Sequence, residues 1–144
     1  MPIWYADGTG ANYTEPLSIT GSKAAFTVYD GSGNPTTVHS TTSVNDGSYH
    51  FIAVTRNKST GLMSLYVDGI LEATATGTTA ALVPATYFDL ASGNAHYTGL
   101  VDDVRIYGTN LTAGNIATIF GASPLSEALD GADLVWTTGG NASW

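Results

Sequence analysis

Between residues 17 and 104, short runs of β-branched and aromatic residues alternate with clusters of Gly, Asn and Asp. Short apolar runs bounded by turn-forming residues are typical of the strands of sandwiches and barrels. In the run Leu62–Val67, the side chains of Met63, Leu65 and Val67 share one face, as expected of a strand with one side in a core. The pattern therefore predicts an all-β fold.

The connections between these runs contain the residues that tight turns require. Asp30–Pro35 is dense in residues that tolerate a positive φ, and it predicts a hairpin between the runs on either side. Asp68-Gly69 predicts the tightest hairpin, because both central residues of a type I′ turn need a positive φ. The strands expected from the runs and the turns together cover residues 17–19, 26–29, 36–40, 49–55, 62–67 and 99–107.

One segment near the end of this region has a helical pattern. Thr112 can cap a helix, Ile116 and Phe120 follow at helical spacing, and Gly121 can end it. Asn115 stands where a capping box would place Glu or Gln, so tertiary packing is expected to hold the helix. The sequence predicts one short helix over residues 111–120.

Composition and charge narrow the class of protein. A chain of 144 residues fits one domain with a two-sheet core. Charged residues make up only 11%, against roughly 25% in soluble domains, which suits an extracellular β-protein. The 12 acidic and 4 basic residues give a net charge of −8. The basic side chains that could neutralise nucleic-acid phosphates are therefore too few, and nucleic acid is excluded as a partner.

No stretch approaches the roughly 20 apolar residues that span a bilayer, so no membrane insertion is expected. The absence of cysteine excludes disulfides and thiolate metal sites.

Four motifs occur in order and at characteristic separations: Tyr49–Thr55, Leu65–Gly69, Gly99–Tyr107 and the helix that begins at Leu111. Together they resemble the laminin-G-like domains of the concanavalin A-like lectin and glucanase superfamily. The resemblance implies an antiparallel two-sheet jelly-roll sandwich with one short C-terminal helix. It also implies a secreted or cell-surface location. The departures are small, such as Asn115 where the family has Glu.

The extent of the resemblance suggests how the chain is organised. We expect a laminin-G-like domain over residues 1–121 whose front strands are missing, followed by an extension over residues 122–144. The extension is either an added strand or the start of a following module. Missing strands would leave a sheet edge and part of the core exposed, and exposed edges recruit strands. The β-prone segments 2–5 and 134–138 are therefore expected to repair the chain's own sheet or to join that of a second copy.

The carboxylates do not form the pair that glycoside hydrolysis requires. Retaining glucanases of this superfamily use a Glu-x-Asp-x-x-Glu strand, since the two carboxyl groups must lie about 5 Å apart. Here Glu15, Glu72 and Glu127 are isolated, and Asp102 and Asp103 would point to opposite faces of a strand. No nucleophile elbow is present, and the three histidines at positions 39, 50 and 96 are too scattered for a metal triad. The sequence favours a protein that is not an enzyme, with no catalytic residues.

Calcium is the one cofactor that the sequence supports. It takes six to eight oxygen ligands, and the resemblance implies that Asp102 or Asp103 helps to bind it. The oxygen-rich loop Asp89–Asn94 offers further ligands. Asp30–Asn34 also has oxygen side chains at alternate positions, but it lacks a following bidentate Glu, so a plain hairpin turn is favoured there. A structural Ca²⁺ ion is accordingly an expectation for Asp102 and Asp103.

Aromatic and amide residues in the expected loops suggest a ligand. Sugar rings stack on aromatic faces, and their hydroxyls bond to amides and carboxylates. The function expected from the sequence is carbohydrate or glycoconjugate binding by a lectin-like module of a secreted multidomain protein. The alternatives are a small hydrolase of glycosides or esters and a structural or adhesive spacer. The candidate ligand-binding residues are Tyr97, with Asn94 and His96 close by in sequence, and Asp89 and Tyr13.

Overall fold

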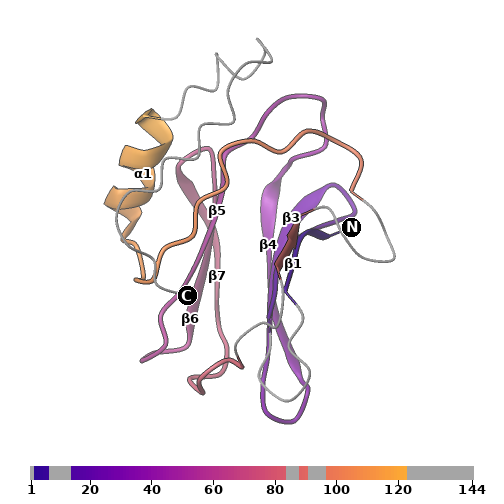
Figure 1. Ribbon diagram of the computed structural model, residues 1–144. Helices are drawn as coiled ribbons and strands as arrows, with labels where there is room; N and C mark the ends of the chain where they lie inside the picture. The colour runs from indigo at the N-terminus through magenta and orange to yellow at the C-terminus, as the bar shows by residue number, and fades with distance from the viewer. Residues whose placement is uncertain (1, 7–13, 84–87, 91–96, 123–144) are drawn as a thin grey trace.

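The computed structural model describes residues 2–6, 14–83, 88–90 and 97–122. Within these ranges the chain forms two antiparallel sheets that face each other, with one helix outside the smaller sheet (Figure 1). The larger sheet has the order β4-β3-β2-β1-β8, and the smaller has the order β5-β6-β7. The elements are β1 (Pro2–Ala6), β2 (Thr14–Thr20), β3 (Lys23–Tyr29), β4 (Pro35–Ser43), β5 (Ile52–Arg56), β6 (Leu62–Val67), β7 (Ile70–Thr76), β8 (Phe88–Leu90) and α1 (Ala113–Ala122). The predicted sandwich with a single short helix is confirmed.

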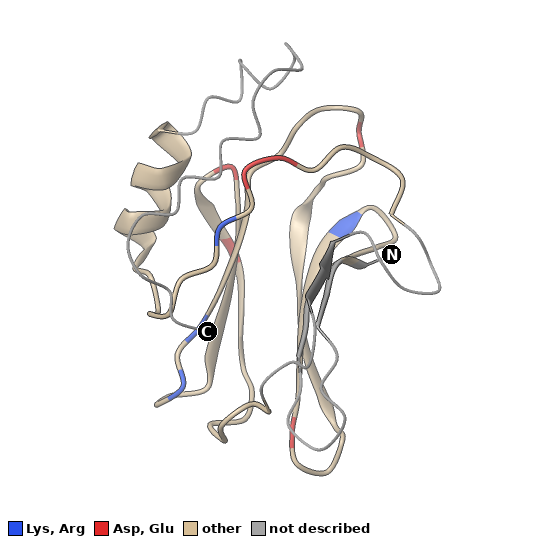
Figure 2. Ribbon diagram, viewed as in Figure 1, with Lys and Arg blue, Asp and Glu red and all other residues tan. Residues whose placement is uncertain are grey.

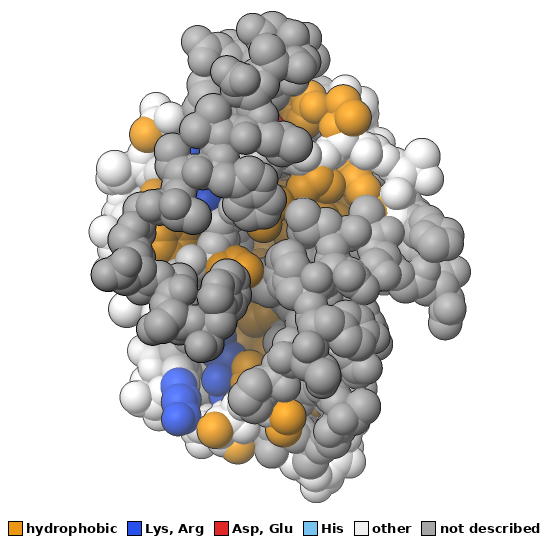
Figure 3. All heavy atoms as spheres, viewed as in Figure 1, with side chains coloured by type: hydrophobic (Ala, Val, Ile, Leu, Met, Phe, Trp, Pro, Cys, Tyr) orange, Lys and Arg blue, Asp and Glu red, His pale blue; other side chains and the backbone are white. Residues whose placement is uncertain are grey.

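The core lies between the two sheets. The alternation predicted for β6 is present, because Met63, Leu65 and Val67 point inward and are 0–2% exposed. From the opposite sheet, Phe26 and Val28 of β3 complete the contact. Figure 3 shows hydrophobic side chains gathered along the middle of one face, between the sheets. Each fully buried side chain of this size contributes roughly 2 kcal/mol, so this contact holds the two layers together.

The two hairpins expected from turn chemistry are present. Asp68 and Gly69 have φ values of 50° and 78° between the paired residues Val67 and Ile70, which is the backbone of a type I′ turn. At the β3–β4 turn, one carboxylate oxygen of Asp30 accepts bonds from the backbone amides of Ser32 at 2.8 Å and Asn34 at 2.9 Å. The Asp30 side chain therefore forms hydrogen bonds within its own turn, as expected of the hairpin turn that the sequence predicts there.

Helix α1 begins with a reciprocal cap. The amide of Asn115 donates to Oγ1 of Thr112 at 3.2 Å, and the amide of Thr112 donates to Oδ1 of Asn115 at 3.1 Å. Asn115 thus performs the role that a capping box gives to Glu or Gln. The helix continues through Ala122, so the prediction that Gly121 ends it was wrong. Ile116 is 3% exposed, which shows that packing against the sandwich supports the helix as expected.

The segment 99–107 differs from the prediction, because it forms no strand. A strand must present its amides to a neighbouring strand, but the amide of Asp103 donates to Oδ1 of Asp102 at 2.8 Å instead. Asp103 also has a φ of 50°, which interrupts an extended chain. Leu100 and Ile106 consequently remain 71% and 63% exposed. Asp102 and Asp103 therefore do not lie on opposite faces of a strand, as the sequence suggested.

Two further segments differ from the expectation, and a third takes one of the two places expected for it. The strand predicted from Tyr49 begins only at Ile52, and Asp89 lies in β8 rather than in a loop. Residues 2–6 form β1 in the chain's own sheet, between β2 and β8. The strand β1 takes the first of the two places that the sequence left open to this segment. Residues 134–138 lie outside the described residues, and the predicted domain limits and missing front strands stay predictions.

The β6–β7 turn supports the helix through a close backbone approach. A Cβ atom added at Gly69 would lie 2.8 Å from the Phe120 ring of α1, whereas one added at Gly33 would meet nothing within 4 Å. Both glycines have a positive φ, of 78° and 80°. The two positions share the backbone strain and differ only in the contact with α1.

We predict that Gly33→Ala lowers the free energy of unfolding by about 1 kcal/mol, the usual cost of placing a Cβ atom in the left-handed region. Gly69→Ala should cost clearly more, about 2 kcal/mol or above, because Phe120 must move as well. Urea denaturation of both variants measures the difference. Equal losses in the two variants would contradict the proposed contact between the turn and the helix.

Candidate functional site

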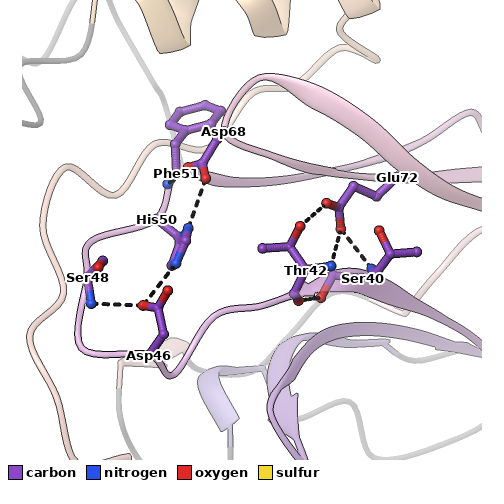
Figure 4. Close-up of polar contacts among 9 residues, drawn as sticks. Ser40, Thr42, Asp46, Ser48, His50, Phe51, Asp68 and Glu72 are labelled. Atoms are coloured by element: carbon purple, nitrogen blue, oxygen red, sulfur yellow. Dashed lines mark hydrogen bonds and ion pairs between the residues drawn. The ribbon is translucent and has the colours of Figure 1, made fainter.

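One group of interacting polar side chains lies where three connections meet at one end of the sandwich. The β4–β5 connection, the β6–β7 turn and the chain after residue 97 all pass this end (Figure 1). At its centre, His50 lies between two carboxylates: its Nδ1 is 2.8 Å from Oδ2 of Asp68, and its Nε2 is 3.2 Å from Oδ1 of Asp46 (Figure 4). We call these three residues the His50 cluster.

The β6–β7 turn fixes the position of Asp68. Its backbone amide donates to the carbonyl of Phe51 at 2.8 Å, and its Oδ1 accepts the amide of Phe51 at 3.0 Å. The side chain thereby extends the β5–β6 ladder by one residue beyond Ile52 and Val67, the last paired residues. Phe51 in turn contacts the Phe120 ring of α1, with ring centroids 5.7 Å apart. Asp68 therefore joins the turn, the start of β5 and the base of the helix.

Asp46 holds the opposite side of the cluster. Its Oδ1 accepts the amide of Ser48 at 2.9 Å, which closes a short turn before His50. That backbone bond, and next the bond to His50, lower the pKa of the Asp46 carboxyl. For His50, the bond to Asp68 is the largest cause that raises the pKa, and the bond to Asp46 adds to it, while partial burial opposes both. The cluster thus favours the imidazolium.

This geometry decides what His50 can do chemically. A histidine that acts as a general base needs one free ring nitrogen within reach of a substrate proton. Both nitrogens of His50 face carboxylates, and its side chain is only 12% exposed. While both contacts are in place, each ring nitrogen of His50 is engaged by a carboxylate, and the arrangement suits the fastening of two connections.

A second polar contact ties the edges of the two sheets together. Oε2 of Glu72 accepts the backbone amides of Thr41 at 2.8 Å and Thr42 at 3.1 Å, and Oε1 accepts the hydroxyl of Thr42 (Figure 4). Glu72 is the extra residue at a β-bulge in β7, since Leu65 pairs with Ala73 while Tyr66 pairs with Leu71. A bulge redirects a side chain, and here it sends the carboxylate across to the edge of β4. We call this contact the Glu72 clip.

The clip also protects an edge strand. β4 lies at the end of its sheet, where unpaired amides invite another chain to pair. Partial burial alone would raise the pKa of Glu72, but the bonds from Thr42 and Thr41 together outweigh it and lower the pKa. The carboxylate therefore stays ionised while it caps two amides of the edge.

The ligand-binding residues predicted from the sequence lie mostly outside the described part. Tyr13, Asn94 and His96 fall there, and Asp89 pairs through its backbone with Tyr5 of β1. Tyr97 is described: its hydroxyl donates to the carbonyl of Leu100 at 3.3 Å. A Cβ atom added at Gly99 would lie 2.8 Å or less from the Tyr97 ring, so the ring lies against the backbone of its own segment.

The residues predicted to bind calcium contact their own neighbours in the sequence. Asp103 forms an ion pair with Arg105, with Oδ1 and Nε 2.7 Å apart, and Asp102 accepts the Asp103 amide. Among the residues that the structure describes, no group of three or more His, Asp or Glu side chains is arranged to hold a metal ion.

In the same part of the chain, no helix is both long and apolar enough to cross a membrane. Figure 2 shows that most of its charged side chains lie on connections at the two ends of the sandwich.

Sequence reasoning did not identify the His50 cluster or the Glu72 clip. One signal for the cluster was present: a hairpin centred on the turn at residues 57–61 pairs Ile52 with Val67, and this register brings His50 and Phe51 close to Asp68. No comparable signal exists for the clip, because it depends on a bulge and on how the two sheets pack.

Comparison with known proteins agrees with the fold. The family described as "Concanavalin A-like lectin/glucanases superfamily" matches residues 2–117, and the chain belongs to this family. No curated protein matches the chain.

Among solved structures, the chain is similar to residues 221–444 of an S-layer domain-containing protein from Clostridium thermocellum, with 20% sequence identity and a TM-score of 0.41. The match covers 81% of this chain and 60% of that one.

We predict that Glu72→Gln lowers the free energy of unfolding by about 1 kcal/mol near neutral pH. This is the usual contribution of a hydrogen bond to a charged group, reduced because Glu72 is partly exposed to solvent. Because the pKa of Glu72 is lowered by folding, its contribution is present above the ordinary Glu pKa of about 4.3 and is lost as the pH falls. The variant should therefore lose less stability than the wild type on acidification. Chemical denaturation at several pH values measures this, with Lys58→Gln, which neutralises an exposed charge in the Asn57–Gly61 turn, as the control. An unchanged pH dependence in Glu72→Gln would contradict the clip.

Proposed function

We propose that this chain is a non-catalytic carbohydrate- or glycoconjugate-binding module of a secreted or cell-surface protein. The observation that carries the proposal is its membership in a superfamily named for lectins and glucanases. Since that membership covers both binding and hydrolysis, the side chains of this particular domain must favour one of them.

The hydrogen bonds and the ion pair that the described carboxylates already form favour binding over hydrolysis. Hydrolysis needs two carboxyl groups facing one glycosidic bond. In the described part, Asp30, Asp46, Asp68 and Glu72 each accept backbone amides that fix a turn or an edge. Asp103 is neutralised by Arg105. These acids support the scaffold, and their use there leaves recognition to loop aromatics and amides.

The proposed ligand face is the loop region around Tyr97. Tyr97 is partly buried and its ring lies against Gly99, which orients an aromatic surface at low entropic cost. Asn94, His96, Asp89 and Tyr13 complete the proposed site on the strength of their chemistry. Asn94 and His96 precede Tyr97 within three residues.

Calcium binding at Asp102 and Asp103 is part of the same proposal. Both residues lie on an exposed segment shortly after Tyr97, and Asp103 would exchange its bond to Arg105 for the ion. An ion there would order this segment next to the ligand face. Binding assays in the presence of Ca²⁺ and of a chelator test this part separately.

Self-association is a further part of the proposal. β8 and β5 are the edges of the two sheets on the side away from the Glu72 clip, and neither pairs with another described strand there. Open edges of this kind accept strands from a second copy. Light scattering over a range of concentrations decides whether the chain is a monomer.

We predict that a glycan array probed with the whole chain gives a defined set of binding glycans. For the best of them, Tyr97→Ala should weaken binding by about tenfold, which corresponds to about 1.4 kcal/mol. Tyr97→Phe keeps the ring and loses only the hydroxyl that bonds to Leu100, so it should bind nearly as well as the wild type.

Two results would contradict this function and point to the alternatives. A folded chain that retains no glycan would favour a structural or adhesive spacer. Turnover of chromogenic glycosides or esters that disappears on substitution of a carboxylate would favour a hydrolase. Matched melting temperatures of the variants ensure that a loss of binding is not a loss of fold.

A further inference from the structure

The two contacts of His50 can both be hydrogen bonds only in one protonation state of its ring. Both ring nitrogens lie within hydrogen-bond distance of carboxylate oxygens, at 2.8 Å from Asp68 and 3.2 Å from Asp46. A carboxylate only accepts, and a neutral imidazole has one donor, so only the imidazolium can donate to both. If the proton is lost, a nitrogen lone pair faces a carboxylate oxygen and one of the two contacts becomes repulsive.

The two contacts differ in length and in how firmly each carboxylate is held. This difference determines which contact breaks when His50 loses its proton. Asp68 is held by the amide of Phe51 and by its place in the β6–β7 turn, and its bond to His50 is the shorter. The Asp46 side chain is 50% exposed, and its bond to His50 is longer. A neutral His50 therefore keeps its proton on Nδ1 toward Asp68 and releases Asp46.

We propose that His50 is a proton-dependent latch that fastens the connection between β4 and β5 to the β6–β7 turn. With the imidazolium present, the connection around Asp46 and Ser48 is held against the sandwich. With the neutral ring, this connection detaches while Asp68 and the turn stay in place.

The charged groups around the latch favour the closed state at low pH. Asp46 from the β4–β5 connection and Asp68 from the turn after β6 both attract the imidazolium. Helix α1, which contacts the turn through Phe120, contains no ionisable side chain. The segment 101–105 carries Asp102, Asp103 and Arg105, and the last two neutralise each other.

The sign of the effect on stability follows from the raised pKa of His50. A group whose pKa is higher in the folded state stabilises the fold fully below its ordinary pKa of about 6.5, and this contribution is lost as the pH rises through the folded value. The latch is thus closed under mildly acidic conditions and opens as the solution becomes alkaline.

The test is an NMR titration of the histidine ring protons, combined with amide hydrogen exchange at about pH 5.5 and about pH 8.5, on either side of the ordinary His pKa. In the wild type, His50 should titrate above that pKa, because the bond to Asp68 and the bond to Asp46 both favour the imidazolium. After correction for intrinsic rates, exchange at the Ser48 amide should accelerate several-fold at the higher pH. Exchange at the Phe51 amide, bonded to Asp68, should stay slow.

A matched pair of variants separates the latch from general effects of charge. Asp46→Asn should lower the pKa of His50 and remove the pH dependence of exchange at Ser48. Asp30→Asn makes the same change in an aspartate that also accepts backbone amides, but in the β3–β4 turn, so it should alter neither. Titration of His50 at or below about 6.5, or equal protection of Ser48 at both pH values, would overturn the proposal.

Discussion

The burial of one face of β6 against the opposite sheet is the contact on which the rest of the molecule depends. β6 is the central strand of its sheet, and Met63, Leu65 and Val67 are almost completely buried. Phe26 and Val28 supply the facing surface. Since β5 and β7 are held mainly by pairing with β6, losing this contact would release the whole smaller sheet together with α1, which packs at its β6–β7 turn.

The polar contacts act at the periphery of this core. A domain with so few charged residues uses several of its acids to satisfy backbone amides that strand pairing leaves free. Glu72 caps the edge of β4, and Asp68 prolongs the β5–β6 ladder. Each carboxylate thereby fixes a connection or an edge at a defined place on the sandwich. A rigid frame of this kind suits a binding module, because loops that are already ordered lose less entropy when a ligand binds.

The His50 cluster and the proposed ligand face lie on different connections and have different chemistry. His50 is enclosed by two acids and serves the scaffold, whereas the Tyr97 hydroxyl bonds to Leu100 within its own, largely exposed segment. Catalysis would require a carboxylate or a histidine with a free atom facing a substrate. Asp30, Asp46, Asp68 and Glu72 instead accept backbone amides, and Asp103 pairs with Arg105, which is the physical argument behind the proposal of a binding module.

The sequence by itself determined the features that depend on neighbouring residues: the inward face of β6, the type I′ turn at Asp68-Gly69, the hairpin at Asp30 and the capped helix. These features follow from the alternation of apolar and polar side chains and from the φ preferences of turn residues, and both act over only a few residues. The tertiary structure decided where distant side chains meet. The His50–Asp68 contact requires the β5–β6 register, and the Glu72 clip requires a bulge and a second sheet. It also decided against a strand at residues 99–107, because a strand forms only where an edge with matching amides is available, and local pattern carries no information about that edge.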